Sequence, residues 1–317
     1  MMEIRYLRHQ EIDDKAWDRC ISRSVNRNLY AYSWYLNLVC EEWDALVEGE
    51  YERVFPLPFR KKAGVHYVYM PPFTQQLGLF STKHLTPGHV EAFLKTIPKH
   101  FRLVEINLNT INRYDGSAIE SSVRRNYELE LIRDYDDLRS SYSANLKRNL
   151  ARAEKAGLQL NTHLSPGEVI QLFRSNRGRN IVTLGDADYR ILERLTHSML
   201  HQGLGQVTGV TGPGNRILAG LIMAEIPQRS ILLFSATERH DENHGALPWL
   251  IDQYIRANAP RQRILDFEGS NDPGLARFYA GFGAKETKYQ QIRIDRLPAP
   301  FRMSLSAYRK LRGFFRA

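Results

Sequence analysis

Two carboxylates near the C-terminal end of the chain have the spacing of a catalytic pair. Asp266 and Glu268 alternate with apolar residues. Residues two apart in an extended strand point to the same face, so both carboxylates are predicted to project together. A carboxylate placed there can take a proton from an attacking group if burial raises its pKa toward neutrality. Glu268 is the preferred candidate because it lies nearer the end of the predicted strand, and an ion pair with Arg263 or Arg277 is the alternative interpretation.

Clusters of basic residues indicate anionic partners. Lys and Arg total 44 against 35 Asp and Glu, which gives a formal net charge of +9. Such patches favour nucleic acid, nucleotide phosphates or anionic lipid, and a solvated surface is the alternative for each patch. The patches comprise Arg148, Arg152 and Lys155; Arg174, Arg177 and Arg179; and Arg296, Arg302, Arg309, Lys310, Arg312 and Arg316.

Several other kinds of active site have no counterpart in the sequence. The ten histidines form no His-Glu-x-x-His motif, and no glycine-rich dinucleotide loop, Walker loop or Gly-x-Ser-x-Gly elbow is present. A hydrolase, a kinase or a dehydrogenase is therefore disfavoured, and no metal is expected. Cys20 and Cys40 are too few for a disulfide framework and lie in apolar, helix-like segments, so both are predicted to be buried thiols.

The composition is that of a globular protein. The chain has 317 residues, of which 43% are hydrophobic and 25% charged. At about 150 residues per domain, this length predicts two domains. No apolar run approaches the roughly 18 residues of a membrane span, and residues 1–6 do not resemble a secretory signal. The expectation is a cytoplasmic protein.

The elements that must position the two carboxylates lie in the second half of the chain. Apolar residues at helical spacing alternate there with β-rich runs and turn residues. This order predicts an α/β (α+β) domain with a mixed sheet. The expected strands are 127–132, 204–210, 217–226, 230–237, 263–268 and 285–294, and the expected helices are 135–156, 166–177, 189–201, one that follows Gly245 and one that begins at Asp272 and Pro273.

The first half is predicted to form a separate domain. The expected boundaries are residues 1–120 for the first domain, 121–298 for the second and 299–317 for a basic amphipathic tail. The paired prolines in residues 71–78 predict a rigid loop. The expected strands of this half are 3–7, 43–47, 51–59, 65–70 and 103–108, and helices are expected up to residue 21 and over 30–40 and 90–101.

Two stretches of the second half resemble known families. In residues 276–284, Tyr279 precedes the turn Gly281-Phe282-Gly283, which resembles the late helix of the Gcn5-related N-acetyltransferase (GNAT) superfamily. Residues 143–157 and 265–270 are similar to the bacterial branch that contains the Fem-type peptidoglycan aminoacyltransferases. This resemblance covers about residues 125–295, and it implies two GNAT-like domains, each a mixed, mostly antiparallel sheet flanked by helices.

The resemblance also implies an activity. It implies an N-acyltransferase that passes an acyl or aminoacyl group to an amine, either a metabolite or a cell-wall precursor. The implied donor is acetyl-CoA or another acyl-CoA. One alternative is an aminoacyl-tRNA-dependent peptidoglycan transferase. Another is a catalytically silent binding protein, because Asp241 and Glu242 occupy the loop in which the superfamily binds phosphates.

Particular residues are assigned to these roles. Tyr279 matches the position of the superfamily's general acid, and Glu268 is assigned as the base. The residues expected to bind the cofactor are Phe234, Ser235, Ala236, Asn243, His244, Gly245 and Ala246. The residues expected to bind the substrate are Tyr32, Gln75, Gln76, Lys147, Arg148, Asp266 and Ser270. The tail, residues 299–317, is a candidate for peripheral contact with an anionic membrane.

Overall fold

The chain packs as two compact units in the computed structural model, which describes residues 3–180, 184–238, 245–269, 271–299 and 302. The first unit comprises residues up to Val123 together with those from Gln290 onward, and the second comprises Arg124–Tyr289. The sequence predicted a boundary at residue 120 and a second domain that ends at 298. The structure assigns residues 290–298 to the first unit, because the last strand pairs with a strand of that unit.

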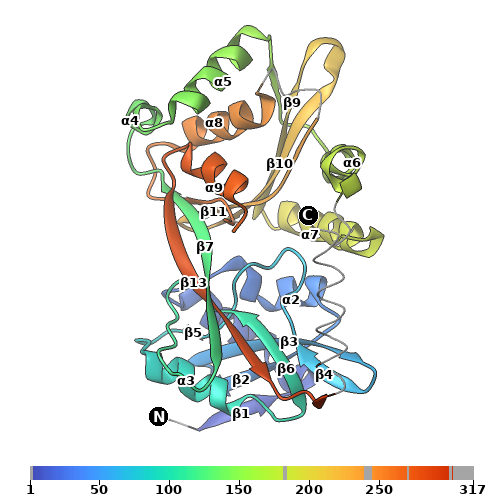
Figure 1. Cartoon of the computed structure of the whole chain (residues 1–317), viewed down its shortest axis with the longest axis vertical. Helices are drawn as coiled ribbons and strands as arrows, with labels where there is room; N and C mark the ends of the chain where they lie inside the picture. Colours follow the sequence, from blue (N-terminus) through green and yellow to red (C-terminus); the bar gives the residue numbers. More distant parts are fainter. Residues whose placement is uncertain (1–2, 181–183, 239–244, 270, 300–301, 303–317) are drawn as a thin grey trace. The chain divides into compact units, whose positions relative to one another are not determined.

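The first unit contains a mixed sheet that is mostly antiparallel. Its strand order is β1-β2-β3-β4-β6-β13, β5 pairs with β3, and among the described strand pairs of this unit β4–β6 is the parallel one (Figure 1). The strands are β1 (Ile4–Leu7), β2 (Glu42–Glu48), β3 (Arg53–Lys62), β4 (Val65–Val68), β5 (Phe80–Ser81), β6 (Phe101–Asn107) and the later part of β13 (Lys285–Asp295).

Helices bury both faces of the central strand of this sheet. The helices are α1 (Asp14–Arg23), α2 (Ser33–Val39) and α3 (Pro87–Thr96), with short 3-10 turns η1 (His9–Glu11) and η2 (Leu29–Ala31). Residues 53–59 of β3 are buried without interruption, as expected for a strand covered on both sides. Cys20 and Cys40 are buried free thiols, which confirms the prediction made for them.

The second unit is built on a run of strands that is also mixed. Its strand order is β7-β12-β11-β10-β9-β8, in which β11 and β12 are parallel and the other described pairs are antiparallel. The strands are β7 (Glu120–Glu130), β8 (Gln159–Asn161), β9 (Gly205–Thr211), β10 (Ile217–Ile226), β11 (Arg229–Thr237) and β12 (Ile264–Asp266), and the first residues of β13 lie beside β7.

Helices cover the two faces of this sheet separately. Leu221 of β10 belongs to the core that contains Leu250 of α8, whereas the neighbouring Gly220 faces Val169 of α6. The helices are α4 (Tyr135–Ser140), α5 (Ala144–Lys155), α6 (Pro166–Ser175), α7 (Asp186–His201), α8 (Ala246–Asn258) and α9 (Pro273–Ala280), with 3-10 turns η3 (Arg177–Asn180) and η4 (Pro213–Asn215). In the described parts of both units, no helix has the length and apolar character needed to cross a membrane.

One predicted helix is divided in the structure. The sequence predicted a single helix over 135–156, but α4 ends at Ser140 and α5 begins at Ala144. The Ser143 side chain accepts a hydrogen bond from the Leu146 N–H and so caps the second helix. Leu138 and Leu146 nevertheless enter the same core, because the apolar spacing is kept across the break.

Candidate functional site

Two parallel strands of the second unit separate near the middle of its sheet. β12 pairs with Arg229–Ile231 of β11 and ends at Asp266, whereas β11 continues to Thr237 alongside β10. After β12 ends, the Phe267 N–H donates to the Tyr127 carbonyl of β7, so the chain stays with β7 and leaves β11. A bulge at Leu233 accompanies the separation. The part of β11 beyond Ile231, which includes Phe234, Ser235 and Ala236, is therefore not paired with β12, and the place where this pairing ends is called the gap below.

Glu268 stands at this gap on a tight turn. Its backbone φ is +49°, a left-handed conformation that residues other than glycine seldom adopt. The Glu268 N–H donates to Asp266 Oδ1 over 2.9 Å, and the Gly269 N–H donates to Asn126 Oδ1 over 2.6 Å. The prediction that Asp266 and Glu268 share one face of a strand is wrong, because the strand ends at Asp266 and the chain turns.

Asp266 is buried in a network of polar side chains. It is 1% exposed, and Arg229 Nη1 lies 2.6 Å from its Oδ2 and 2.8 Å from Glu128 Oε1. Asn126 Nδ2 donates to Asp266 Oδ1 over 3.0 Å. Burial by itself lowers the pKa of Arg229, but the attraction of Asp266 and Glu128 raises it above its usual value, so the guanidinium stays charged. Asp266 therefore organises the turn, and its assignment as a binding residue stays a prediction that this burial disfavours.

Tyr279 lies close to Glu268. Its ring stacks on Phe267 with centroids 5.0 Å apart, and the side chain is 9% exposed. Burial raises the pKa of Tyr279 to about 12, the Glu268 carboxylate adds to the increase, and the Arg177 guanidinium opposes it. The phenol is thus protonated at neutral pH and able to donate a proton. Tyr279 packs in the core of the second unit, and its assignment as the general acid stays a prediction.

Two further groups at this site were not assigned from the sequence. Burial raises the pKa of Tyr289, on β13, to about 12; Arg124 opposes the increase and Glu268 adds to it. Glu268 therefore acts electrostatically on two phenols. Arg177 comes from η3, the turn between α6 and α7, and was noted only as part of a basic patch. No local sequence signal links either residue to Glu268.

The predicted phosphate-binding loop lies largely outside the described residues. Asn243, His244 and Ser270 belong to residues that the structure does not describe, as does the tail from residue 303. Gly245 has a left-handed φ of +66° and directly precedes α8, which begins at Ala246. The positive end of the α8 dipole favours an anion at this position.

Comparisons with solved structures agree with this architecture. FemX matches with a TM-score of 0.61 and 14% identity, over 91% of this chain and 97% of FemX. L-PGS from Bacillus licheniformis matches with a TM-score of 0.56 and 12% identity, over 93% of this chain and 96% of that chain. A tandem GNAT protein from the clavulanic acid pathway matches with a TM-score of 0.50 and 12% identity, over 94% of this chain and all of that chain. The chain has the Fem-type, GNAT-like fold. No family model and no curated protein matches the sequence.

The first GNAT-like unit contains three of the predicted substrate residues. Gln76 is 2% exposed; its Oε1 accepts from the Thr110 N–H, and its Nε2 donates to Gln75 Oε1. Gln76 thus holds the loop in place, and its assignment to substrate binding stays a prediction that this burial disfavours. Gln75 is partly buried, with its backbone carbonyl bound by Asn107. Tyr32 is half-buried directly before α2, and burial raises its pKa.

The two basic residues assigned to substrate lie on the exposed face of α5. Lys147 Nζ donates to the Ser140 carbonyl over 2.8 Å at the end of α4. Arg148 Nη2 is 3.4 Å from Asn145 Oδ1 within the same helix. Lys147 therefore stabilises the end of a helix, while Arg148 keeps most of its guanidinium at the surface.

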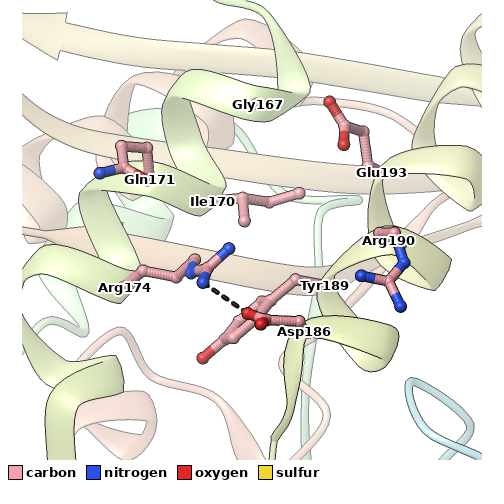
Figure 2. A pocket seen from close by; sticks show the side chains of 8 residues that line it. All are labelled: Gly167, Ile170, Gln171, Arg174, Asp186, Tyr189, Arg190 and Glu193. Atoms are coloured by element: carbon pink, nitrogen blue, oxygen red, sulfur yellow. Dashed lines mark hydrogen bonds and ion pairs between the residues drawn. The ribbon is translucent and has the colours of Figure 1, made fainter.

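A pocket of about 350 Å³ lies between α6 and α7 (Figure 2). Arg174 Nη2 lies 2.5 Å from Asp186 Oδ1 in this pocket. The guanidinium carbon of Arg174 also lies over the Tyr189 ring, 4.9 Å from its centroid. Figure 2 shows Arg190 and Glu193 on the α7 side. The pocket carries balanced charges that are already partly paired, and Glu268 and Tyr279 are not among its lining residues. This pocket is therefore a surface feature separate from the candidate site at Glu268.

Proposed function

We propose that the second unit transfers an acyl or aminoacyl group from an activated donor to an amine. The observation that carries this proposal is the separation of β11 from β12, with Glu268 and Tyr279 together beside the gap. An extended donor chain can lie along β11 past Leu233 as a strand does, through main-chain hydrogen bonds. The Fem-type, GNAT-like fold agrees with a transferase of this kind.

The residues can move the two protons that the reaction requires. The amine nitrogen attacks the acyl carbon, the new C–N bond forms, and Glu268 accepts the proton that the nitrogen loses. The bond to the leaving group breaks, and Tyr279 donates its proton to the departing sulfur or oxygen. Burial keeps this proton on the phenol at neutral pH, so Tyr279 holds it when the bond to the leaving group breaks. Positioned acids and bases of this kind contribute about 10²–10⁴-fold each to the rate.

The donor is proposed to be an acyl-CoA, with aminoacyl-tRNA as the alternative. Phe234, Ser235 and Ala236 flank the gap, and the start of α8 offers a dipole suited to phosphate. Binding of acetyl-CoA should raise the melting temperature; a ligand at a hundred times its Kd stabilises the native state by about 2.7 kcal/mol. Charged tRNA should instead bind with a steep dependence on salt.

The test combines this thermal titration with a turnover assay. Release of the CoA thiol is followed with a panel of primary amines, and aminoacyl transfer from charged tRNA is measured in parallel. Glu268→Gln and Tyr279→Phe should each lower kcat by about 10²-fold or more. Glu286→Gln, which changes a carboxylate on β13 that is paired with surface cations, is the matched control. Binding of neither donor, or parental turnover in both site variants, would overturn the proposal.

A further inference from the structure

We infer that Asn126 is a positioning residue for acyl transfer: its side-chain amide fixes the turn on which Glu268 stands. This inference rests on the proposed function, in which Glu268 is the base. Asn126 lies on β7 and is 0% exposed, so it cannot contact a substrate itself. Its effect on the reaction must pass through the residues that it holds.

Both ends of the Asn126 amide bind the same turn. Oδ1 accepts from the Gly269 N–H over 2.6 Å, and Nδ2 donates to Asp266 Oδ1 over 3.0 Å. These contacts lie on either side of Glu268, one residue after it and two residues before it. A single side chain thus clamps the turn from both directions.

Asp266 completes the clamp. The oxygen that receives Asn126 Nδ2 also accepts from the Glu268 N–H, while the other oxygen is held by Arg229 at 2.6 Å. Asn126 and Glu268 therefore depend on the same carboxylate oxygen, and Arg229 fixes that carboxylate. Loss of the amide would remove the hydrogen bond to the Gly269 N–H and one of the two donors to Asp266 Oδ1.

The close contact between the turn and β7 requires glycine. A Cβ added to Gly269 would lie 2.5 Å from the Cα of Asn126 and 2.7 Å from its carbonyl carbon, distances that no real contact allows. The backbone at residue 269 is therefore packed directly on the backbone of Asn126. This contact, together with the clamp, supports the left-handed backbone of Glu268, which an L residue rarely adopts without such support.

The position of the Glu268 carboxylate matters because its neighbours come from other elements. Tyr279 is on α9 and Tyr289 is on β13, and Glu268 raises the pKa of both phenols. If Glu268 relaxed to a negative φ, its side chain would leave this arrangement while the rest of the unit stayed folded. A displacement of about 1 Å at a reacting group can cost about 10²-fold in rate.

The test is a cycle of variants in the full chain. Asn126→Ala should lower acetyl-CoA-dependent kcat by about 10²-fold with little change in KM, and it should have less than about a twofold effect in the Glu268→Gln background. Asn126→Asp keeps the shape but places a carboxylate against Asp266, so it should also lose activity; retained activity would mean that Asn126 only fills space. Asn271→Ala is the matched control, since Asn271 joins the same loop to β7 through the Arg125 N–H and should leave kcat unchanged.

A second readout needs no substrate. In protein labelled with ¹³C at the glutamate carboxyl, the Glu268 signal is identified by its loss in Glu268→Gln, and its titration midpoint should move in Asn126→Ala but not in Asn271→Ala. An unmoved midpoint, or an equal loss of kcat with and without Glu268, would overturn the inference even if Asn126→Ala proves less stable. Parental activity in Glu268→Gln would instead refute the proposed base, and the titration alone would then decide whether Asn126 positions Glu268.

Discussion

Replacement of Arg229 by methionine removes a cation that contacts two carboxylates of the second unit. Arg229 Nη1 lies 2.6 Å from Asp266 and 2.8 Å from Glu128. Methionine retains much of the apolar stem but leaves both carboxylates without their partner. The Asp266 side chain is only 2% exposed, so water cannot take over the role of the guanidinium.

The size of the loss follows from this burial. Removing one partner of a buried ion pair costs about 3–5 kcal/mol, because an uncompensated charge remains in the interior. Asp266 keeps two donors, Asn126 Nδ2 and the Glu268 N–H, which places the expected loss near the lower end, about 3 kcal/mol. Adding Asp266→Asn to Arg229→Met should recover part of that loss, since the double variant removes the orphaned charge along with its partner.

Urea unfolding followed by far-ultraviolet circular dichroism measures the free energy, and hydrogen exchange of β11 and β12 peptides assigns the loss to the second unit. Arg125→Met is the matched control: Arg125 lies 3.7 Å from Glu286, and its side chain is 56% exposed, so its loss should cost less than about 1 kcal/mol. Acidification, which neutralises the orphaned carboxylates, should reduce the penalty of Arg229→Met. A loss no larger than the control's, or one independent of pH, would refute the reasoning.

Two further substitutions test other parts of the second unit. Burial raises the pKa of Asp252, which accepts a hydrogen bond from Tyr135. The stability that this raised pKa contributes is therefore complete below the unfolded pKa of about 4, and it is lost as pH rises through the folded pKa. Asp252→Asn should therefore gain melting temperature relative to the parent between pH 4 and pH 8, and a constant difference would contradict this. Gly209→Ala would place a Cβ 2.0 Å from Leu164 and 2.8 Å from the Ala219 carbonyl, which should cost about 1–3 kcal/mol in urea unfolding. Leu164→Ala should recover only part of that cost, because the backbone contact remains.

Most elements of the second unit follow from local rules. Asp272 and Pro273 predicted the start of α9, and the Asp272 side chain indeed accepts from two N–H groups of the first turn. The division between α4 and α5 was missed because apolar spacing continues across it. Ser143 was visible as a capping residue, but helical spacing alone did not show that a new helix begins there.

The geometry of the site was harder to predict. Alternation placed Asp266 and Glu268 on one face, but alternation holds only while the backbone stays extended. An aspartate often accepts a hydrogen bond from the N–H two residues later and so starts a turn, and this was the available signal. Asn126 binds this turn and Glu268 raises the pKa of Tyr289, yet both residues come from distant parts of the sequence, and no periodicity within a segment encodes such relationships.

The shared strand β13 reverses the order in which the two units can be completed during synthesis. Residues 291–295 pair with β6 and belong to the first unit, yet they leave the ribosome after every residue of the second unit has been made. Domains usually fold in the order in which they emerge. Here the whole sequence of the second unit is synthesised first, and until then the edge of β6 that pairs with β13 has no strand partner and can pair with a wrong strand. During synthesis, mispairing at the edge of β6 is therefore a hazard until residues 291–295 have emerged.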